Sequence, residues 1–465
     1  MRFFLPIVVL AAVVGCRGAR APAAATVATT STWDYVVHDQ GDELAIEATF
    51  GPTEGDAFAV DDDATPFVRA VEVADGAAWR AVADRGGRFG LACGNGCRLR
   101  YRFRLRAAAL ALDDAAAALA VGKVLVAPPS TWLLRPTDGE EHAQVRLTAP
   151  DAPLVCALHV AADGARELAA VDVDGAGLVV FGRPRVETLP SGDARIEVVL
   201  AAEELALDDA AVLALLRADV DALAHYFGRF PVDRLLLVVG DNRGSGPSNG
   251  LTLGGGGASV LVQLARDVDL PHALVGEWVP IHELLHAAMP DLPRQHGWLS
   301  EGLASYLEPL VRERAGLITP EKLWRELVEG APQGLPAPGD QGLDGTHTWA
   351  RTYWGGTLFC LLADVRIREQ TAGRASLDDA MRAIAAAGGT VVAHWSLDRW
   401  IDAGDAATGT HVLRELYVQW AHAPVPVDLG ALWKQLGVVV TPDAVRFDDA
   451  APLAAIRRAM TPPIR

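Results

Sequence analysis

The clearest chemical signal in the chain is an HExxH motif that starts at His282 and ends at His286. In a helix, side chains four positions apart lie on one face, so both imidazoles can bind the same metal ion. Glu283 lies about a third of a turn away from His282. It can hydrogen-bond a water molecule at the metal without being a ligand, which is what a general base for hydrolysis requires. The spacing therefore predicts a hydrolytic zinc site.

A catalytic zinc ion needs three protein ligands and one open position, so a third ligand must follow the motif. The candidates are Asp291, His296 and Glu301. His296 lacks the spacing and the glycine of the metzincin motif. Asp291 lies in a Pro-flanked turn, where it already has a structural role. Glu301 lies in a second helical stretch that can fold back beside the first helix, and we therefore expect it to complete a site for one zinc ion.

The sequence around these residues resembles the gluzincin peptidases. HELLH is followed by WLSEGLASY at residues 298–306, and the pair is similar to the HExxH and WLxEGxAxY motifs of that family. YWGG at residues 353–356 looks like the start of the family's YxxG helix. HYFGRFP at residues 225–231 is similar to the start of the catalytic domain in the glycyl aminopeptidases, to which the likeness is closest. The resemblance covers the larger part of the chain, and it implies a β-domain followed by a thermolysin-like domain.

The resemblance also assigns roles to individual residues. It implies the ligands and the base given above, and it adds Tyr353 as a phenol that hydrogen-bonds the developing oxyanion. From the residues alone, Tyr353 could equally pack on an amphipathic helix, and Tyr306 is an alternative phenol that is more typical of a core. No Asp or Glu occupies the place of a ligand to a second metal ion, so a one-zinc site is expected.

The glycine-rich stretch from Gly250 to Ser259 resembles the strand that borders the active-site cleft of gluzincins. Glycines leave the backbone edge uncovered, so we expect Gly254, Gly255 and Gly256 to contact an extended peptide substrate. The alternative is a flexible loop with no ligand role, because consecutive glycines weaken a strand. The family's exopeptidases carry a Glu here that holds the free amine of the substrate, and this stretch has none. We therefore expect internal cleavage or a relaxed exopeptidase.

Two folded domains are expected to position these motifs, in an α+β multidomain protein. Residues 33–204 contain short apolar and polar alternations broken by Gly, Pro and Asp, which predict a β-sandwich-like domain. Helical spacing follows, and a buried strand is expected at Leu235–Val239. We assign residues 205–425 to a thermolysin-like, largely helical catalytic domain and residues 426–465 to a C-terminal extension. Further helices are expected near residues 272–289, 299–315, 320–329, 352–369 and 377–387.

The N-terminus has the pattern of a bacterial lipoprotein. Residues 1–15 combine Arg2 with an apolar run too short to span a bilayer, which is typical of a signal peptide. The run ends just before Cys16, as in a lipobox, where a diacylated Cys becomes the mature N-terminus; a plain secretory peptide is the alternative. Residues 16–32 are rich in Ala, Thr and Pro and are expected to form a flexible tether. Because Arg17 and not Asp follows the Cys, we expect an exported protein anchored in the outer membrane of a diderm bacterium.

The other cysteines are expected to meet oxidising conditions, where they can pair. Cys93 and Cys97 flank a Gly-rich turn between two strand-like runs, and we expect a small-loop disulfide between them. A zinc ribbon would need a second pair at similar spacing, and Cys156 and Cys360 do not supply one.

Charge and motifs limit the classes of partner. The formal net charge of -18 would repel a phosphate backbone, which excludes nucleic acid and leaves a peptide or protein substrate and the membrane. Residues 246–250 match a GxSxG nucleophile elbow around Ser248, but a glycine run follows in place of the required helix.

The alternative function is a lipoprotein whose inactive peptidase domain serves as a binding or scaffold module, although the intact Glu283 argues against it.

Overall fold

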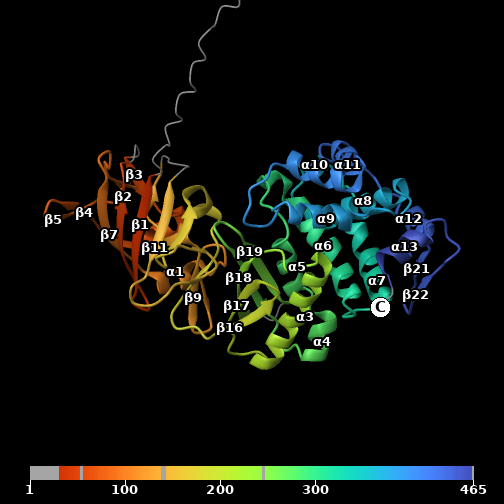
Figure 1. Ribbon diagram of the computed structural model, residues 1–465, viewed down its shortest axis with the longest axis horizontal. Helices are drawn as coiled ribbons and strands as arrows, with labels where there is room; N and C mark the ends of the chain where they lie inside the picture. The colour runs from red at the N-terminus through yellow and green to blue at the C-terminus, as the bar shows by residue number, and fades with distance from the viewer. Residues whose placement is uncertain (1–30, 53–55, 138–142, 243–246, 463–465) are drawn as a thin grey trace, which may run out of the picture. The chain divides into compact units, whose positions relative to one another are not determined.

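The computed structural model describes residues 31–52, 56–137, 143–242 and 247–462 (Figure 1). The expected signal peptide, Cys16 and nearly all of the expected tether lie outside these described residues. Within them, no helix is both long enough and apolar enough to cross a membrane.

A β-rich domain forms the first part of the described chain. Its largest sheet has eight strands in the order β13 (His159–Val160), β14 (Arg166–Ala169), β11 (Gln144–Thr148), β1 (Thr32–Asp39), β2 (Leu44–Phe50), β7 (Cys97–Phe103), β4 (Val68–Asp75) and β5 (Ala78–Ala81). In β7, Leu99, Tyr101 and Phe103 are buried, and the arginines between them are exposed on the other face. The same alternation runs along β2, so the paired strands bury one common face.

Two smaller sheets complete this domain. One has the order β10 (Arg135–Pro136), β3 (Ala57–Ala59), β6 (Phe89–Gly90), and the other has the order β12 (Val155–Cys156), β15 (Val179–Phe181), β9 (Val124–Ala127), β8 (Leu119–Val121). Cys93 and Cys97 form a disulfide at the start of β7, with Cα atoms 5.2 Å apart. Cys156 and Cys360 are buried free thiols. The α-helices of the domain are α1 (Leu105–Leu112) and α2 (Pro129–Trp132), and the 3-10 helices η1 (Asp62–Phe67) and η2 (Ala170–Gly175) also belong to it.

A five-stranded sheet begins the second domain. Its order is β16 (Val186–Ser191), β17 (Ala194–Leu200), β18 (Arg234–Asp241), β20 (Ala258–Leu264) and β19 (Asn249–Leu253), which leaves β19 at an edge. β17 pairs in parallel with β18, so residues 186–200 belong to this sheet and not to the first domain. The expected domain boundary at residue 204 is therefore wrong, because the alternation within a strand does not specify which strand it pairs with.

Helices make up most of the remaining chain. They are α3 (Asp209–Phe227), α4 (Leu270–Gly276), α5 (Val279–His286), α6 (Gly297–Arg314), α7 (Pro320–Gly330), α8 (Gly356–Gln370), α9 (Leu377–Ala386), α10 (Leu397–Thr408), α11 (Val412–Trp420), α12 (Leu429–Leu436) and α13 (Ala454–Met460). A short π-helix, η5 (Arg351–Gly355), leads directly into α8. The helix expected over residues 272–289 is two helices, because Pro280 lies in the first turn of α5. The expected order of a β-rich domain and a largely helical domain is confirmed (Figure 1).

The C-terminal segment is part of the second domain and not a separate extension. Met460 of α13 is fully buried in the hydrophobic core that also contains residues of α5 and α6. Arg457 donates hydrogen bonds to the carbonyl oxygens of Leu436 and Gly437 at 3.1 and 2.8 Å. The assignment of residues 426–465 is corrected in this respect, since burial in a shared core makes the segment contribute to the stability of the whole domain.

Two glycines set the distance between the helices α6 and α8. Gly302 on α6 faces Gly356 at the start of α8, and a Cβ atom at either position would lie 2.3 Å from backbone atoms of the other helix. No larger side chain fits between them, so the close approach requires glycine at both positions. The approach holds η5, and with it Tyr353, beside the helix that carries Glu301.

Candidate functional site

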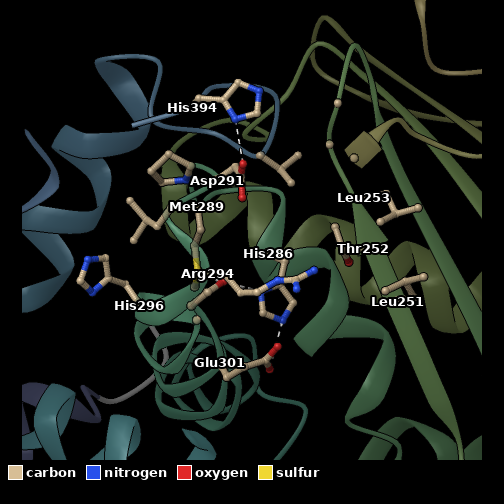
Figure 2. Close-up of a pocket in the computed structure, with 18 of the residues that line it drawn as sticks. Leu251, Thr252, Leu253, His286, Met289, Asp291, Arg294, His296, Glu301 and His394 are labelled. Carbon is tan, nitrogen blue, oxygen red and sulfur yellow. Dashed lines mark hydrogen bonds and ion pairs between the residues drawn. The ribbon is translucent and has the colours of Figure 1, made fainter. Parts of the chain in front are cut away.

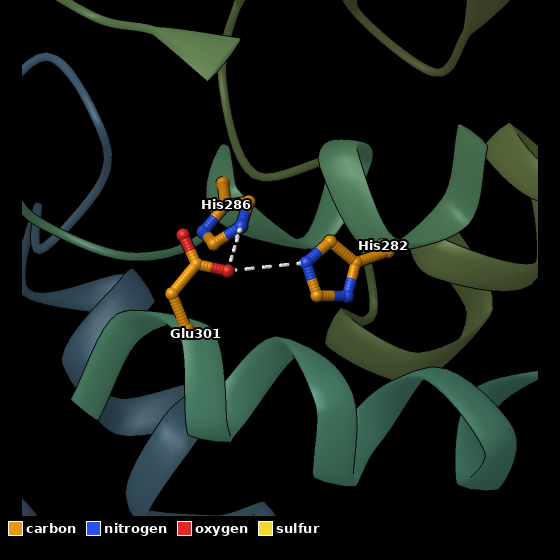
Figure 3. A group of neighbouring side chains, drawn as sticks. All are labelled: His282, His286 and Glu301. Atoms are coloured by element: carbon orange, nitrogen blue, oxygen red, sulfur yellow. Dashed lines mark hydrogen bonds and ion pairs between the residues drawn. The ribbon is translucent and has the colours of Figure 1, made fainter. Parts of the chain in front are cut away.

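Three of the predicted site residues meet where α5 and α6 pack together (Figure 3). His282 and His286 point from successive turns of α5 toward Glu301 on α6. The Oε2 atom of Glu301 lies 3.3 Å from Nε2 of His282 and 3.5 Å from Nε2 of His286. All three possible ligand atoms lie within 4.8 Å of one another. The structure therefore brings these three side chains into one cluster.

The spacing within the cluster fits a tetrahedral metal ion. Zinc binds imidazole nitrogen and carboxylate oxygen at about 2.0–2.2 Å, so two ligand atoms of a tetrahedral site lie about 3.3–3.6 Å apart. The two separations in the cluster, 3.3 and 3.5 Å, agree with this geometry. Two imidazoles and one carboxylate are also the donor set of a catalytic zinc site that leaves a fourth position open.

Ser300 orients one of the two imidazoles. Its Oγ atom lies 2.9 Å from Nδ1 of His286 and 3.6 Å from the sulfur of Met289. A hydroxyl that donates to the sulfur can accept the Nδ1 proton, which leaves the Nε2 lone pair of His286 free for a metal. The Nδ1 atom of His282 is buried and has no partner among the described residues.

The charges of the cluster also favour a cation. Burial raises the pKa of Glu301, but hydrogen bonds from His282 and His286 outweigh it and hold this pKa well below its usual range. Burial lowers the pKa of His286, and the hydrogen bond and charge of Glu301 more than reverse that effect. The carboxylate is therefore ionised at neutral pH, and a divalent cation would compete only with protons on the imidazoles.

Glu283 lies beside the cluster and is held by the edge strand β19. The Oγ1 atom of Thr252 lies 2.7 Å from Oε2 of Glu283 and 2.9 Å from its backbone oxygen. Gly250 lies two residues earlier on the same face of the strand, and a Cβ atom there would lie 2.4 Å from Cγ of Glu283. The strand therefore confines the carboxylate from one side. A carboxylate fixed in this place can accept a proton from water in the cleft.

Tyr353 reaches the same cluster from η5. Its ring stacks on the imidazole of His282, with centroids 6.0 Å apart and an interplanar angle of 17°. Its hydroxyl hydrogen-bonds Glu301. Burial of the phenol is the larger cause that raises its pKa, and the negative charge of Glu301 raises the pKa further. The phenol therefore keeps its proton at neutral pH and can donate a hydrogen bond to a developing oxyanion. π-Helical turns such as η5 are frequent at functional sites.

The other candidate metal ligands have partners elsewhere. The Nδ1 atom of His296 lies 3.0 Å from the carboxylate of Asp344. The carboxylate of Asp291 lies 2.7 Å from Nδ1 of His394. Of the three candidates, the structure therefore places only Glu301 against the two histidines of the motif.

Two further candidates are also engaged outside the cluster. Tyr306, the alternative phenol, is fully buried and donates a hydrogen bond to Asp364 at 2.9 Å. The hydroxyl of Ser248 hydrogen-bonds Glu277 and accepts a hydrogen bond from the backbone nitrogen of Ala265 at 2.9 Å. No imidazole contacts Ser248 within the described residues, so a serine nucleophile with its base is not formed there.

The glycine-rich stretch borders the cleft only in part. Gly254 and Gly255 line the cleft, whereas Gly256 packs against the first domain, where a Cβ atom would lie 2.5 Å from Cβ of Leu168. The expectation that Gly256 contacts substrate is therefore corrected. Gly255 also accepts a hydrogen bond from the backbone nitrogen of Gly177 at 3.0 Å. Close packing against the first domain explains Gly255 and Gly256, whereas a Cβ atom at Gly254 would lie 2.0 Å from the backbone oxygen of Val391 in the second domain. The strand edge that borders the cleft is β19.

The cluster opens into a cleft of about 830 Å³ (Figure 2). One wall is β19, and another is the loop between α5 and α6. At one end, His394 lies 2.7 Å from Asp172 of the first domain and 2.7 Å from Asp291 of the loop. The hydrogen bond to Asp172 raises the pKa of His394, burial opposes it, and Asp291 raises it further. The two ion pairs tie three segments together at this end of the cleft.

Sequence reasoning did not find Thr252, Ser300, His394 or Arg294 as residues of the cleft. Ser300 directly precedes Glu301 in the second motif, and that position could have marked it. Thr252 contacts Glu283, which lies 31 positions away, and no local sequence pattern predicts such a contact. The same holds for the residues at the His394 end of the cleft, which come from segments far apart in the chain.

Comparisons with known proteins identify the fold. Neither a protein-family model nor a curated protein matches the chain. Among solved structures, an aminopeptidase N family protein from Idiomarina loihiensis has a TM-score of 0.66 at 15% identity, with 88% of this chain and 79% of that chain covered. A glutamate-to-alanine variant of an M1 zinc metallopeptidase from Deinococcus radiodurans has a TM-score of 0.50 at 16% identity, with 86% and 95% covered.

These likenesses confirm the gluzincin resemblance at the level of the fold. The closer likeness to the glycyl aminopeptidases stays a prediction. In both structural neighbours, the match extends over most of each chain, so it includes the β-rich domain as well as the domain that carries the cluster. The chain therefore has the two-domain fold of the M1 zinc metallopeptidases.

Proposed function

We propose that the chain is a zinc-dependent peptidase, with His282, His286 and Glu301 as the ligands of one zinc ion. The observation that carries this proposal is the cluster itself, in which the ligand atoms have tetrahedral separations of 3.3 and 3.5 Å. Glu283 lies next to these atoms and is fixed by an edge strand that borders the cleft. The fold that the chain shares with M1 zinc metallopeptidases supports the same activity.

In this mechanism, Glu283 is the general base. An extended peptide lies along β19, with the scissile carbonyl facing the cluster. Zinc would polarise this carbonyl and lower the pKa of the attacking water to about 7. Glu283 takes a proton from the water as the new C–O bond forms, and it passes this proton to the amine as the C–N bond breaks. Tyr353 donates a hydrogen bond to the oxygen on which negative charge develops.

The cleft offers little to hold the free amine of a peptide. Besides Glu283 and Glu301, the carboxylate among its described lining residues is that of Asp291, which is paired with His394. An ammonium group would therefore lack an unpaired acidic partner away from the cluster. We propose internal cleavage, or an exopeptidase that does not depend on the N-terminal amine.

Metal content and digestion of a peptide library test this function together. We expect one zinc ion per chain, cleavage of library peptides, loss of cleavage after chelation and recovery after zinc is added back. Mass spectrometry of the products separates terminal from internal cleavage. Zinc without any cleavage would favour the inactive binding module, and a protein that holds no zinc would contradict the proposed site.

We also propose that acylated Cys16 anchors the chain in the outer membrane. The proposal is supported by an apolar segment of signal-peptide length that ends immediately before this Cys. Two or three acyl chains hold a protein on a membrane far more firmly than one. The wild-type chain should therefore sediment with membranes, and Cys16→Ser should move it to the soluble fraction. Unchanged fractionation of the variant would rule out this anchor.

A further inference from the structure

The cleft contains an unpaired positive charge. Arg294, at the start of the short helix η3 (Arg294–His296), is the one arginine or lysine among the described residues that line the cleft. Its side chain is exposed, and it forms no hydrogen bond or ion pair within the described residues. Figure 2 shows this side chain extending into the cleft in the direction of His286. The guanidinium is therefore available to a ligand.

The acidic groups of the cleft do not neutralise Arg294, because each has another partner. Glu301 faces the two histidines of the cluster, and Glu283 is hydrogen-bonded to β19. Asp291, three residues before Arg294, is paired with His394 at 2.7 Å. A guanidinium presents a rigid fork of donors that matches a carboxylate. Arg294 is thus a carboxylate-binding group that no carboxylate of the described residues occupies.

The loop that carries Arg294 also bounds the cleft. Its Asp291 is joined to the segment around His394 by backbone hydrogen bonds, to the oxygen of Ala393 at 2.9 Å and from the nitrogen of Trp395 at 3.0 Å. His394 continues this boundary to Asp172 of the first domain. A peptide that lies along β19 and extends toward this end reaches the three segments that carry Asp291, His394 and Asp172, which hydrogen bonds join. Every free peptide ends in a carboxylate whatever its sequence, whereas an acidic side chain occurs only in some peptides, so a chain terminus is the group expected at Arg294.

We infer that Arg294 binds a carboxylate of the peptide substrate, and that the C-terminal carboxylate of a short peptide is its ligand. An acidic side chain next to the scissile bond offers the same chemistry and is distinguished by the experiment. The inference deepens the proposed peptidase function and rests on it. It makes the free C-terminus, and not the free amine, the end of the substrate that this cleft recognises.

Matched peptides test the inference directly. The probe is the tetrapeptide that the wild-type chain cleaves best in the library, prepared as the free acid and as the C-terminal amide. Dissociation constants are measured by calorimetry on zinc-loaded Glu283→Gln protein, which does not consume the peptide. The value of kcat/KM is measured on protein that keeps Glu283. We expect the acid to bind roughly 10- to 100-fold more tightly than the amide, the range for a hydrogen bond between charged groups. Arg294→Gln should abolish this preference and leave the zinc content unchanged.

Two further variants sharpen the result. Arg294→Lys should keep part of the preference, because an ammonium retains the charge and loses the fork. Arg374→Gln removes the same charge from an exposed residue that does not line the cleft, and it should keep the full preference. A preference for the acid that survives Arg294→Gln would overturn the inference.

A second peptide pair identifies the source of the carboxylate. It is the same tetrapeptide amide with either Glu or Gln after the scissile bond. Suppose that the acid and the amide bind equally well, and that the Glu peptide binds better than the Gln peptide only when Arg294 is present. Arg294 then binds an acidic side chain and not the C-terminus. If neither pair shows a preference although the peptides are cleaved, the inference is wrong and the peptidase function stands. If the wild-type chain neither cleaves nor binds any peptide, the proposed function itself fails.

Discussion

Glu283→Gln is expected to keep its zinc and to lose almost all peptide hydrolysis. Glu283 is not one of the three clustered ligands, so the change should leave the metal content intact. The amide is close in size, and its oxygen can still accept the hydrogen bond that Thr252 makes at 2.7 Å. What it cannot do is accept the proton of the attacking water. A positioned general base contributes about 10²- to 10⁴-fold in rate, so kcat should fall by roughly this factor with little change in KM.

Steady-state kinetics and zinc analysis of a matched variant complete this test. Glu369→Gln removes the same charge from an exposed residue near the end of α8 and should behave as wild type. Turnover near the wild-type rate in Glu283→Gln would mean that another group takes the proton, and the mechanism would be wrong. Loss of zinc in the same variant would instead place Glu283 among the groups that hold the metal.

His286→Ala is expected to lose zinc, and with it the stabilisation that zinc confers. The substitution removes one of the three converging ligands, and even the loss of an outer partner lowers metal affinity by about 10- to 100-fold. A ligand that binds only the folded state stabilises it by about 4 kcal/mol at 1,000 times its dissociation constant. Added zinc should therefore raise the melting temperature of the wild-type chain and leave that of the variant nearly unchanged.

Thermal melts with and without zinc measure this effect, since each protein is compared with its own metal-free form. Glu301→Gln is a second variant of similar size, which covers the case in which His286→Ala is too unstable to purify. His422→Ala removes an exposed histidine that is outside the cluster and should keep the full response to zinc. The same rise in melting temperature for His286→Ala as for the wild type would exclude this histidine as a ligand.

The motif itself could be interpreted from the sequence because its geometry is local. His282, Glu283 and His286 lie within two turns of one helix, and helical spacing alone decides which of their side chains share a face. The second motif also indicated Glu301, but helical spacing could not rank it against Asp291. That ranking depends on partners from other segments, and in the structure the partner of Asp291 is a histidine 103 positions away.

The glycines show the same limit in another form. Their run was expected to leave a backbone edge open to a peptide substrate, and in the structure Gly254 and Gly255 line the cleft. Sequence alone could not say which segments lie against these glycines, and at Gly255 and Gly256 they belong to the first domain. The boundary between the domains was misplaced for a related reason, because β16 and β17 carry the alternation of any strand and only their pairing with β18 assigns them to the second sheet.

The sequence by itself determined the helical motif, the order of a β-rich and a helical domain, and the acidic net charge. Only the tertiary structure decided which carboxylate faces the two histidines, that Thr252 holds Glu283, and that His394 joins segments 222 positions apart at one end of the cleft. The physical reason is the range of the interactions. Periodicity and spacing record how a residue is placed relative to its neighbours in the chain, whereas contacts between distant segments arise from how whole sheets and helices pack.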